Sequence, residues 1–399
     1  MIERVMDYQG YFDWAATTPI SELAASVYIG TAREYIGNPS SIHREGQRAS
    51  RYLLELRQDI ARLVGADAKS ITFTSGGTES DAIILNSLLR NKAPGQVIIP
   101  RFEHAAVTQY AKLLTDFGWE VRQLQTPGGY VTPQQIAQAL TEKTRLVCCM
   151  LVNNVTGTRQ DVASIAGVLR EYSRKTGRNI HFHCDAVQAL GKIPIDLKKL
   201  GVDSAAFSAH KFCGPRGVGF LYNTNSAVVS LSRGGGQENG LRPGTENLAG
   251  IASMTAALND ATMKLDEHFA NAVAIKRYFE QRFAAEAPGI VQISPSVDSE
   301  YSASPYILSF SAQGLPSEVF TRMLFDQGFC VSSGSACSNN AKQKGDGILQ
   351  AMGFDAKLAS SAVRLSYGYG TTLESAERLA DAIISTYLRH APSRFTALK

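Results

Sequence analysis

Apolar residues follow two different spacings along the first 255 residues of the chain. At intervals of three and four they predict helices, as at Leu53, Leu56, Ile60 and Leu63, which fall on one helical face. Between such segments lie short apolar runs rich in β-branched and aromatic residues, which favour strands. Strands and helices that alternate in this way are typical of a mostly parallel sheet with helices on both faces. The predicted strands span residues 71–74, 96–100, 145–152, 179–184 and 204–208.

The spacing changes after Gly250. A single long helix is predicted from Met254 to about Ala285, and the last helix is expected to begin with a capping box formed by Thr371 and Glu374. We therefore expect a large α/β domain over residues 13–255 and a smaller α+β domain over residues 256–399, which residues 1–12 join. The strands predicted for the smaller domain span residues 307–310, 328–331 and 362–366, and the apolar face of its last helix comprises Ala376, Leu379, Ala380, Ile383 and Tyr387.

The composition narrows the class of protein. Charged residues make up 19% of the 399 residues, against a usual share of about 25%, so we expect a surface that is either small for the mass of the chain or partly buried against a second subunit. The net charge of +4 gives no reason to expect a nucleic-acid partner. The longest uninterrupted apolar run, residues 146–152, is far short of the ~20 residues that cross a membrane, and the first 13 residues contain no signal-peptide segment. Six cysteines in a chain of this length do not indicate a disulfide scaffold, so we expect a cytoplasmic protein with reduced thiols.

Two predicted loops carry candidate chemistry. The segment Ser75-Gly-Gly-Thr78 joins a strand to a helix, where free backbone N–H groups and the helix dipole favour a phosphate, although the same residues also fit a tight turn with a helix cap. Lys211 follows the strand at 204–208 and stands beside His210. An apolar neighbourhood at that position can lower the pKa of the amine and make it a nucleophile, although most lysines are simply exposed.

Asp185 ends a third predicted strand, and a carboxylate that closes an apolar strand is costly unless it is paired. The preceding His181, His183 and Cys184 could also suggest a metal site. Alternate residues of a strand point to opposite faces, however, so the two histidines share one face and Cys184 lies on the other. No second ligand pair at zinc-like spacing follows, and we expect no metal at this position.

The three features are more informative together than singly. A phosphate-binding turn, a buried aspartate and a nucleophilic lysine, each at the end of a strand, are the parts that a pyridoxal phosphate (PLP) enzyme needs. The aspartate keeps the pyridine nitrogen protonated, so that the ring can withdraw electrons.

Motifs along nearly the whole chain resemble those of the class V, fold type I PLP enzymes, and specifically the cysteine desulfurases of the NifS/IscS type. The resemblance implies a seven-stranded, mostly parallel sheet and a homodimer. Ser332-Ser-Gly-Ser-Ala-Cys337 is the most specific motif, because it separates these desulfurases from plain aminotransferases. The other motifs begin at Tyr11 (YFDWAATTP), Gly37 (GNPSSIH), Thr74 (TSGGTES), Glu103 (EHAAV), Val152 (VNN), Asp185 (DAVQ), Ser208 (SAHK), Arg242 (RPGTEN) and Val363 (VRLS).

The resemblance also implies roles for individual residues. Lys211 would hold PLP covalently and act as a catalytic base, Asp185 would pair with the ring nitrogen, and Gln188 would contact the phenolic oxygen. His104 would stack on the ring and move protons. Gly77, Thr78, Ser208 and His210 would bind the phosphate together with Thr245 from the partner subunit. Asn154 and Arg364 would hold the substrate carboxylate, Asn154 would also contact the cofactor, and Asn38 would contact the substrate.

Cys337 is the residue that distinguishes the implied activity. It stands in a polar segment, residues 332–347, with almost nothing apolar to bury, and we expect a mobile loop there. In the implied reaction, L-cysteine loses its sulfur to Cys337, which becomes a persulfide, and L-alanine is released. A sulfur-acceptor protein would then take the sulfur for iron–sulfur cluster assembly or other thio-biosynthesis. Of the other cysteines, Cys213 alone stands near Lys211 and is a minor candidate for a chemical role.

The sequence departs from the family pattern in three places. Val155 stands where an acidic residue is usual, Gln237 replaces a histidine in a glycine run, and the chain ends soon after its last helix, whereas relatives that dock an iron–sulfur scaffold often have a longer tail. Three rival interpretations stay open: a class V aminotransferase in which Cys337 is incidental, a selenocysteine or cysteine-sulfinate lyase, and a non-catalytic scaffold with the same fold.

Overall fold

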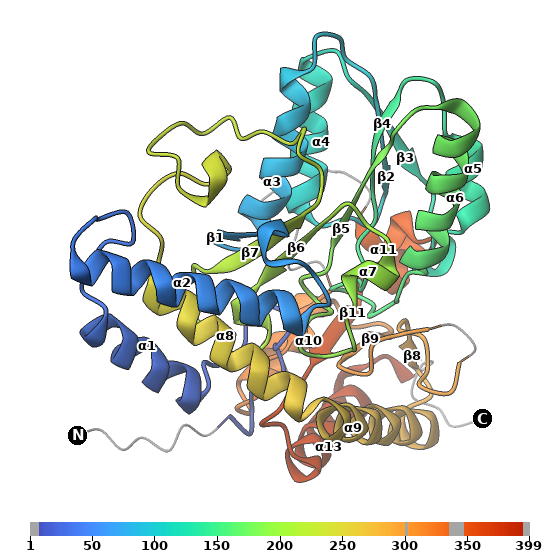
Figure 1. The fold of residues 1–399 in the computed structure, drawn as a ribbon. Helices are drawn as coiled ribbons and strands as arrows, with labels where there is room; N and C mark the ends of the chain where they lie inside the picture. Colours follow the sequence, from blue (N-terminus) through green and yellow to red (C-terminus); the bar gives the residue numbers. More distant parts are fainter. Residues whose placement is uncertain (1–7, 300–301, 335–346, 394–399) are drawn as a thin grey trace.

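The computed structural model describes residues 8–299, 302–334 and 347–393 and has a large mixed sheet at its centre (Figure 1). The sheet has seven strands in the order β1-β7-β6-β5-β4-β2-β3. β7 runs antiparallel to both of its neighbours, and the other pairs are parallel, which confirms the mostly parallel sheet. The strands are β1 (Ile71–Thr74), β2 (Gln96–Pro100), β3 (Glu120–Leu124), β4 (Thr144–Cys148), β5 (His181–Asp185), β6 (Ser204–Ser208) and β7 (Gly219–Asn223).

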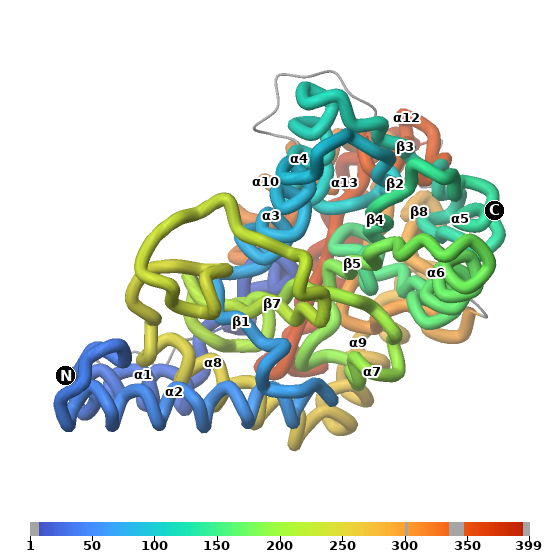
Figure 2. The backbone as a smooth tube through the Cα atoms, turned by 45° about the horizontal axis from the view of Figure 1, so that its top comes forward, coloured from blue at the N-terminus to red at the C-terminus, as the bar shows by residue number. Residues whose placement is uncertain are grey.

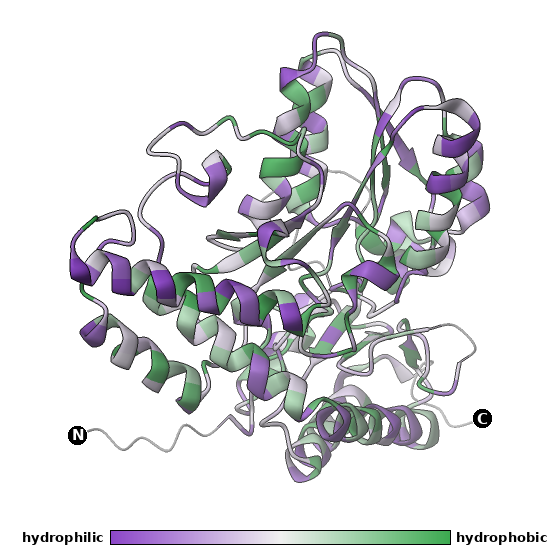
Figure 3. Cartoon of the chain, viewed as in Figure 1, coloured by the Kyte–Doolittle hydropathy of each residue, from purple (hydrophilic) through white to green (hydrophobic). Residues whose placement is uncertain are grey.

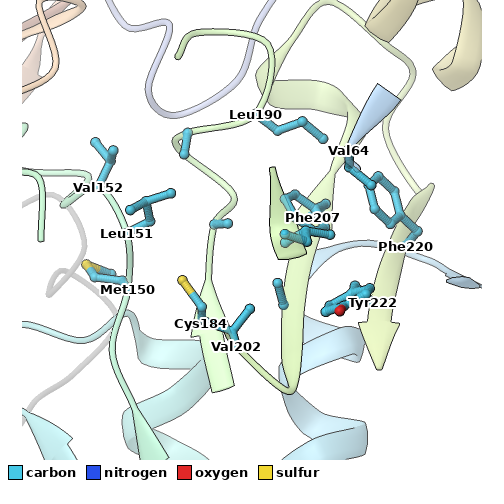
Figure 4. Close-up of a cluster of buried hydrophobic side chains, with 14 of the residues drawn as sticks. Val64, Met150, Leu151, Val152, Cys184, Leu190, Val202, Phe207, Phe220 and Tyr222 are labelled. Carbon is cyan, nitrogen blue, oxygen red and sulfur yellow. The ribbon is translucent and has the colours of Figure 1, made fainter. Parts of the chain in front are cut away.

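Helices cover both faces of this sheet because its strands bury side chains on both sides. Val97 and Ile99 of β2 pack into one cluster with α3 and α4, whereas Ile98 between them packs into a second cluster with α2, α6 and α8. Part of the second cluster, including Phe207 and Phe220, is drawn in Figure 4. These helices, with α1, α5 and α7, are α1 (Glu22–Glu34), α2 (Arg44–Leu63), α3 (Gly77–Ser87), α4 (Ala105–Asp116), α5 (Pro133–Ala139), α6 (Val162–Thr176), α7 (Leu197–Leu200) and α8 (Leu248–Met263).

A smaller, antiparallel sheet with the order β10-β11-β9-β8 lies beside the large one. It has its own hydrophobic cluster, into which Phe12 and Trp14 from the start of the chain also pack. Figure 3 shows the apolar residues concentrated inside and hydrophilic residues on the outer faces of the helices. The elements are α9 (Leu265–Glu286), β8 (Ile290–Gln292), β9 (Ile307–Ala312), α10 (Ser317–Phe325), β10 (Ser332–Ser333), α11 (Ile348–Ala351), α12 (Ala356–Ser360), β11 (Ala362–Ser366) and α13 (Leu373–His390).

Helices α1, α2 and α8 pack together along one side of the molecule (Figure 2). The long helix predicted from Met254 is in fact two helices, because the backbone leaves helical geometry at Lys264 (ψ 13°), between α8 and α9. No glycine or proline marks that break in the sequence. Within the described residues, no helix is long and apolar enough to cross a membrane.

Three other element predictions also need correction. β4 ends at Cys148 rather than at residue 152, and two residues later the backbone N–H of Met150 donates to the carboxylate of Glu103 instead of to a neighbouring strand. The strand predicted at 328–331 is reduced to an isolated bridge between Cys330 and Tyr11. The last helix is capped by Thr372, whose side chain accepts from the N–H of Ser375. The hydroxyl of Thr371 accepts instead from the N–H of Gly368 in the preceding turn.

Candidate active site

A cavity of about 570 Å³ opens at the carboxyl ends of the large sheet's strands and reaches the smaller sheet. Ligands bind at this edge in open α/β sheets. Asp185 reaches the cavity from the end of β5, Ser208 from the end of β6, and Arg364 from β11. The predicted site residues that line this cavity are Gly77, Thr78, His104, Asn154, Asp185, Gln188, Ser208, His210, Lys211 and Arg364.

The turn between β1 and α3 brings backbone close to the cavity floor. Gly76 has φ of +148°, which glycine adopts readily, and a Cβ at Gly77 would lie 2.6 Å from Cγ2 of Val187. Only glycine therefore permits this approach without displacing Val187. The first turn of α3 follows at once, and its backbone N–H groups and dipole suit an anion such as a phosphate.

Lys211 lies in the short segment between β6 and β7, against the chain's N-terminal strap, residues 13–18. Its Nζ donates to the carbonyl oxygens of Ala15 and Ala16, both at 2.6 Å. The neighbouring His210 places Nδ1 3.1 Å from the hydroxyl of Thr17. Burial, together with the positive charge of Lys211, lowers the pKa of His210 to about 4, so this ring is neutral at pH 7.

Asp185 is buried, and its Oδ1 accepts from the N–H of Val187 at 3.0 Å. Two further buried carboxyl groups, Asp81 and Glu103, lie near it. Burial and the charge of Asp185 raise the pKa of both. Asp81 also lines the cavity, and its Oδ2 has no hydrogen-bond partner among the described residues. The site therefore concentrates acidic groups around the position of Asp185.

A chain of hydrogen-bonded side chains supports Asp81 from below the cavity. The amide nitrogen of Asn225 can only donate, so Nδ1 of His181 accepts from it at 3.0 Å. Nε2 of His181 then donates to the Ser204 hydroxyl (2.7 Å), and that hydroxyl donates to Nδ1 of His183 (2.8 Å). Nε2 of His183 is left to donate to Oδ1 of Asp81 (2.9 Å). Burial lowers the pKa of both histidines to about 4, which agrees with two neutral rings.

These bonds confirm that His181 and His183 share one face of β5, because both contact Ser204. They also use both nitrogens of each ring. Among the described residues no group of three or more His, Cys, Asp or Glu side chains is arranged to hold a metal ion.

Arg364 faces the cavity from the smaller sheet. Its guanidinium donates to the carbonyl of Asn154 at 2.9 Å and to Oδ1 of Asp13 at 2.7 Å. Arg364 is buried, and its Nε has no hydrogen-bond partner within the described part of the chain. A buried guanidinium held at two of its nitrogens is oriented for a carboxylate ligand, which it can bind through two parallel hydrogen bonds.

His104 caps the N-terminus of α4 and lines the cavity. Its Nδ1 accepts from the N–H of Ala106 at 3.1 Å. In the neutral ring the proton is therefore on Nε2. A histidine held in one orientation in this way can exchange a proton with a bound ligand at Nε2.

Two predicted site residues of the described chain do not line the cavity. Asn38 and Thr245 contact each other instead, with Nδ2 of Asn38 donating to the Thr245 hydroxyl at 3.4 Å. Cys337 lies outside the described residues. Four functional candidates were missed: Asp13, Asp81, Glu103 and Lys192. The sequence holds a weak signal for three of them, since Asp13 and Glu103 belong to family motifs and Lys192 stands one helical turn after Gln188.

The residues present fit PLP. An amine, a buried carboxylate and a helix N-terminus meet in one cavity, and they match the aldehyde, basic ring nitrogen and phosphate of that cofactor. The unpartnered oxygen of Asp81 and nitrogen of Arg364 are polar atoms that a cofactor and an amino-acid substrate would approach.

Comparison with known proteins agrees with this chemistry. Residues 10–379 match the family described as aminotransferase class-V. A protein from Lactobacillus delbrueckii subsp. bulgaricus, described as a NifS/IcsS protein homolog, is 38% identical over 94% of this chain and 97% of its own length. The cysteine desulfurase IscS of Dictyoglomus turgidum is 33% identical over 95% of this chain and 94% of its own.

Solved structures lead to the same group. A structure titled NIFS-like protein has a TM-score of 0.86 and 32% identity, and the match covers 94% of this chain and 98% of that one. A structure titled SspA in complex with cysteine has a TM-score of 0.76 and 28% identity, over 90% and 98% of the two chains. The chain therefore belongs to the class V aminotransferase family and, within it, to the cysteine desulfurases of the NifS/IscS type.

Proposed function

We propose that this protein converts L-cysteine to L-alanine with PLP held by Lys211, and that Cys337 receives the sulfur as a persulfide. The observation that carries the proposal is the convergence of Lys211, Asp185, Arg364 and the N-terminus of α3 on one cavity. When bound, PLP supplies an electron sink that stabilises negative charge at the substrate's α-carbon.

The chain's own residues divide the remaining work. Arg364 binds the substrate carboxylate and so orients the amino acid between the two sheets. Lys211 lies beside the strap carbonyls, and once substrate has taken its place its amine is the base that removes the α-proton. Asp185 keeps a proton on the ring nitrogen, and His104 exchanges one at Nε2. The Cys337 thiolate then attacks the substrate sulfur, so that an S–S bond forms as the substrate's Cβ–S bond breaks, and the β-carbon, which keeps that electron pair, takes up a proton to give alanine.

The test is turnover of L-cysteine by the PLP-loaded enzyme, followed by mass spectrometry of the peptide that contains Cys337. We expect alanine in amounts equal to the sulfide released by a thiol reductant, and a mass increase of one sulfur atom on Cys337. Cys337→Ser should abolish turnover, whereas Cys330→Ser, which removes an exposed cysteine, should leave it unchanged. Turnover by Cys337→Ser at the wild-type rate would refute the persulfide step and favour a lyase or aminotransferase.

We further propose a homodimer in which Thr245 completes the phosphate site of the partner subunit. Thr245 and Asn38 contact each other outside their own chain's cavity, in a region that also exposes apolar side chains. Ile29, Ile36 and Ile42 around α1 and α2 are at least half exposed, as expected for a face that a second copy covers. Light scattering tests the dimer, and Thr245→Ala should weaken PLP binding. A monomer with full affinity would contradict both statements.

The sulfur acceptor is proposed only as a class. A persulfide reacts with a thiol or thiolate of an acceptor, so we propose a sulfur-carrier or iron–sulfur scaffold protein in a reducing cytoplasm. Incubation of the ³⁵S-labelled enzyme with candidate acceptor proteins measures the transfer directly. Label that stays on the enzyme with every such protein would contradict this class of partner.

A further inference from the structure

Lys192 is a buried lysine that none of the proposed steps uses. It follows β5 in a tight turn, in which the N–H of Ile193 donates to the carbonyl of Ala189 at 3.0 Å. Gly191 in this turn has φ of +73°, and the hydroxyl of Tyr369 donates to its carbonyl at 2.6 Å. The turn is therefore held in place, and Lys192 is only 4% exposed.

The ammonium group of Lys192 has one hydrogen-bond partner close to the cofactor cavity. Its Nζ donates to Oε1 of Gln188, one helical turn earlier, at 3.0 Å. Within the described residues it forms no ion pair with a carboxylate, and the charges of Lys211 and Arg364 oppose it. A buried cation without an anionic partner is costly, and an apolar residue in its place would stabilise the fold. A residue kept at such a cost in folding free energy is expected to have a functional role.

The bond to Gln188 has a directional consequence. An ammonium group can only donate, so the Gln188 side chain must present its carbonyl oxygen to Lys192. Its NH₂ group is then forced to the opposite side, where Nε2 donates to the carbonyl of Ala15 at 2.8 Å. That carbonyl also accepts from Lys211, and Gln188 lines the cavity. Lys192 and the Ala15 carbonyl, one only a donor and the other only an acceptor, thus together fix which end of the amide faces the ligand.

We propose that Lys192 is a positioning residue, which locks the Gln188 amide with its NH₂ group toward the ring oxygen of the cofactor. The inference rests on the proposed function, in which PLP occupies this cavity. A reversed amide would place a carbonyl oxygen against an anionic ring oxygen and lose a charge-assisted hydrogen bond. The positive charge of Lys192 also lies near that of Lys211, and the two charges repel each other.

Burial, and after it the charges of Lys211 and Arg364, lower the pKa of Lys192 to about 7, although Cys213 opposes the change. The cation is therefore held below pH 7 and lost above it. A neutral amine can accept as well as donate, so the orientation of Gln188 is fixed most strongly at the acid end of the working range. This adds a pH dependence to the effect of any substitution at Lys192.

Two equilibrium measurements test the proposal without relying on turnover: the Kd for PLP, and the pH titration of the absorbance band of the PLP–Lys211 adduct. Lys192→Met should raise the Kd about tenfold, as expected for loss of one charge-assisted hydrogen bond. It should also raise the apparent pKa of the band, because a nearby cation is removed. Lys198→Met, at a lysine whose side chain is 63% exposed, is the matched control and should change neither.

A double-mutant cycle with Gln188→Ala separates positioning from a simple charge effect. If Lys192 acts through Gln188, Lys192→Met should add nothing to the Kd of Gln188→Ala. Lys192→Gln keeps a donor without the charge and should restore most of the affinity, but not the pKa of the band. The inference is overturned if Lys192→Met binds PLP as tightly as wild type, or if the two substitutions simply add. Failure of the wild-type protein to form the adduct would instead overturn the proposed function.

Discussion

The buried ion pair between Arg57 and Glu238 gives a sharp prediction about how the segment before Thr245 is anchored. Two guanidinium nitrogens of Arg57, on α2, lie 2.6 Å from the two carboxylate oxygens of Glu238. Glu238 also accepts from the N–H of Phe73 in β1 at 2.8 Å, and the guanidinium stands 4.6 Å from the centre of the Phe73 ring. The side chains are 16% and 1% exposed, so the pair is shielded from solvent.

Arg57→Met leaves a desolvated carboxylate with one backbone N–H, and breaking a buried pair in this way costs about 3–5 kcal/mol of unfolding free energy. Glu238→Gln should cost less, because its amide oxygen can still accept from Phe73 and because Arg57 is closer to solvent. Since the two residues contact each other, the double variant should lose about 1.5–3 kcal/mol less than the sum of the single losses.

The assay is urea unfolding of the PLP-loaded enzyme, with the protein and PLP concentrations fixed because binding shifts apparent stability. Arg62→Met is the matched control: Arg62 lies on the same helix and pairs with Asp59 at 2.9 Å, but the side chains are 67% and 48% exposed. That pair should contribute at most about 1 kcal/mol. A loss for Arg57→Met no larger than that of Arg62→Met would refute the reasoning.

Three further predictions concern the core and the site. Lys276 is fully buried without a hydrogen-bond partner in the described structure, and burial lowers its pKa to about 8, so Lys276→Met should stabilise the fold by about 3 kcal/mol at pH 7. Between pH 8 and 10.5 only the folded state loses the Lys276 proton, so the stability of the wild-type protein rises over that range. The stability advantage of Lys276→Met, measured by urea unfolding, should therefore shrink from pH 8 to 10.5. An advantage that does not change with pH would contradict this explanation. The pKa values of His181 and His183 are lowered to about 4, so the folded protein loses stability as the pH falls from 6.5 toward 4, where only the unfolded chain takes up these protons. At pH 5.5, ¹⁵N NMR should show two neutral rings protonated at Nε2. A charged ring at that pH would disprove the hydrogen-bond directions. Gly77→Ala should weaken PLP binding at least tenfold, because its Cβ meets Val187 at 2.6 Å, and Val187→Ala should restore much of the affinity; an unchanged Kd would show that the turn tolerates a Cβ.

The sequence alone predicts the position of a site residue where the pattern that marks it lies within one segment. Asp185 and Lys211 could be placed because each follows an apolar strand, and alternation along β5 correctly put His181 and His183 on one face. The sequence does not predict the outcome where two neighbouring residues could serve equally well and tertiary packing selects one of them. Thr371 and Thr372 are both able to cap α13, and only the turn bond to Gly368 determines which one does.

Partners that are distant in the chain were also beyond prediction. Asp81 and His183 are 102 residues apart, and Asp13 and Arg364 are 351 apart. The sheet order and the packing of the two sheets bring these residues together, and periodicity within one segment carries no information about either. Lys192 shows the same problem, because an i, i+4 spacing after Gln188 indicates contact only once the intervening turn is known to be helical.

The strap at residues 13–18 links the smaller sheet to the loops of the large sheet at the site. Its Ala15 N–H donates to the hydroxyl of Ser366 at 2.8 Å, and Asp13 holds Arg364, so it is fixed to β11 of the smaller sheet. The carbonyl of the same Ala15 accepts from Gln188 and Lys211 of the large sheet's loops. The group that would bind the substrate carboxylate and the amine that would hold the cofactor are thus connected through a few backbone atoms. A shift of the smaller sheet therefore acts on Lys211 through this strap, and on the cavity wall through the bond from Arg364 to the carbonyl of Asn154.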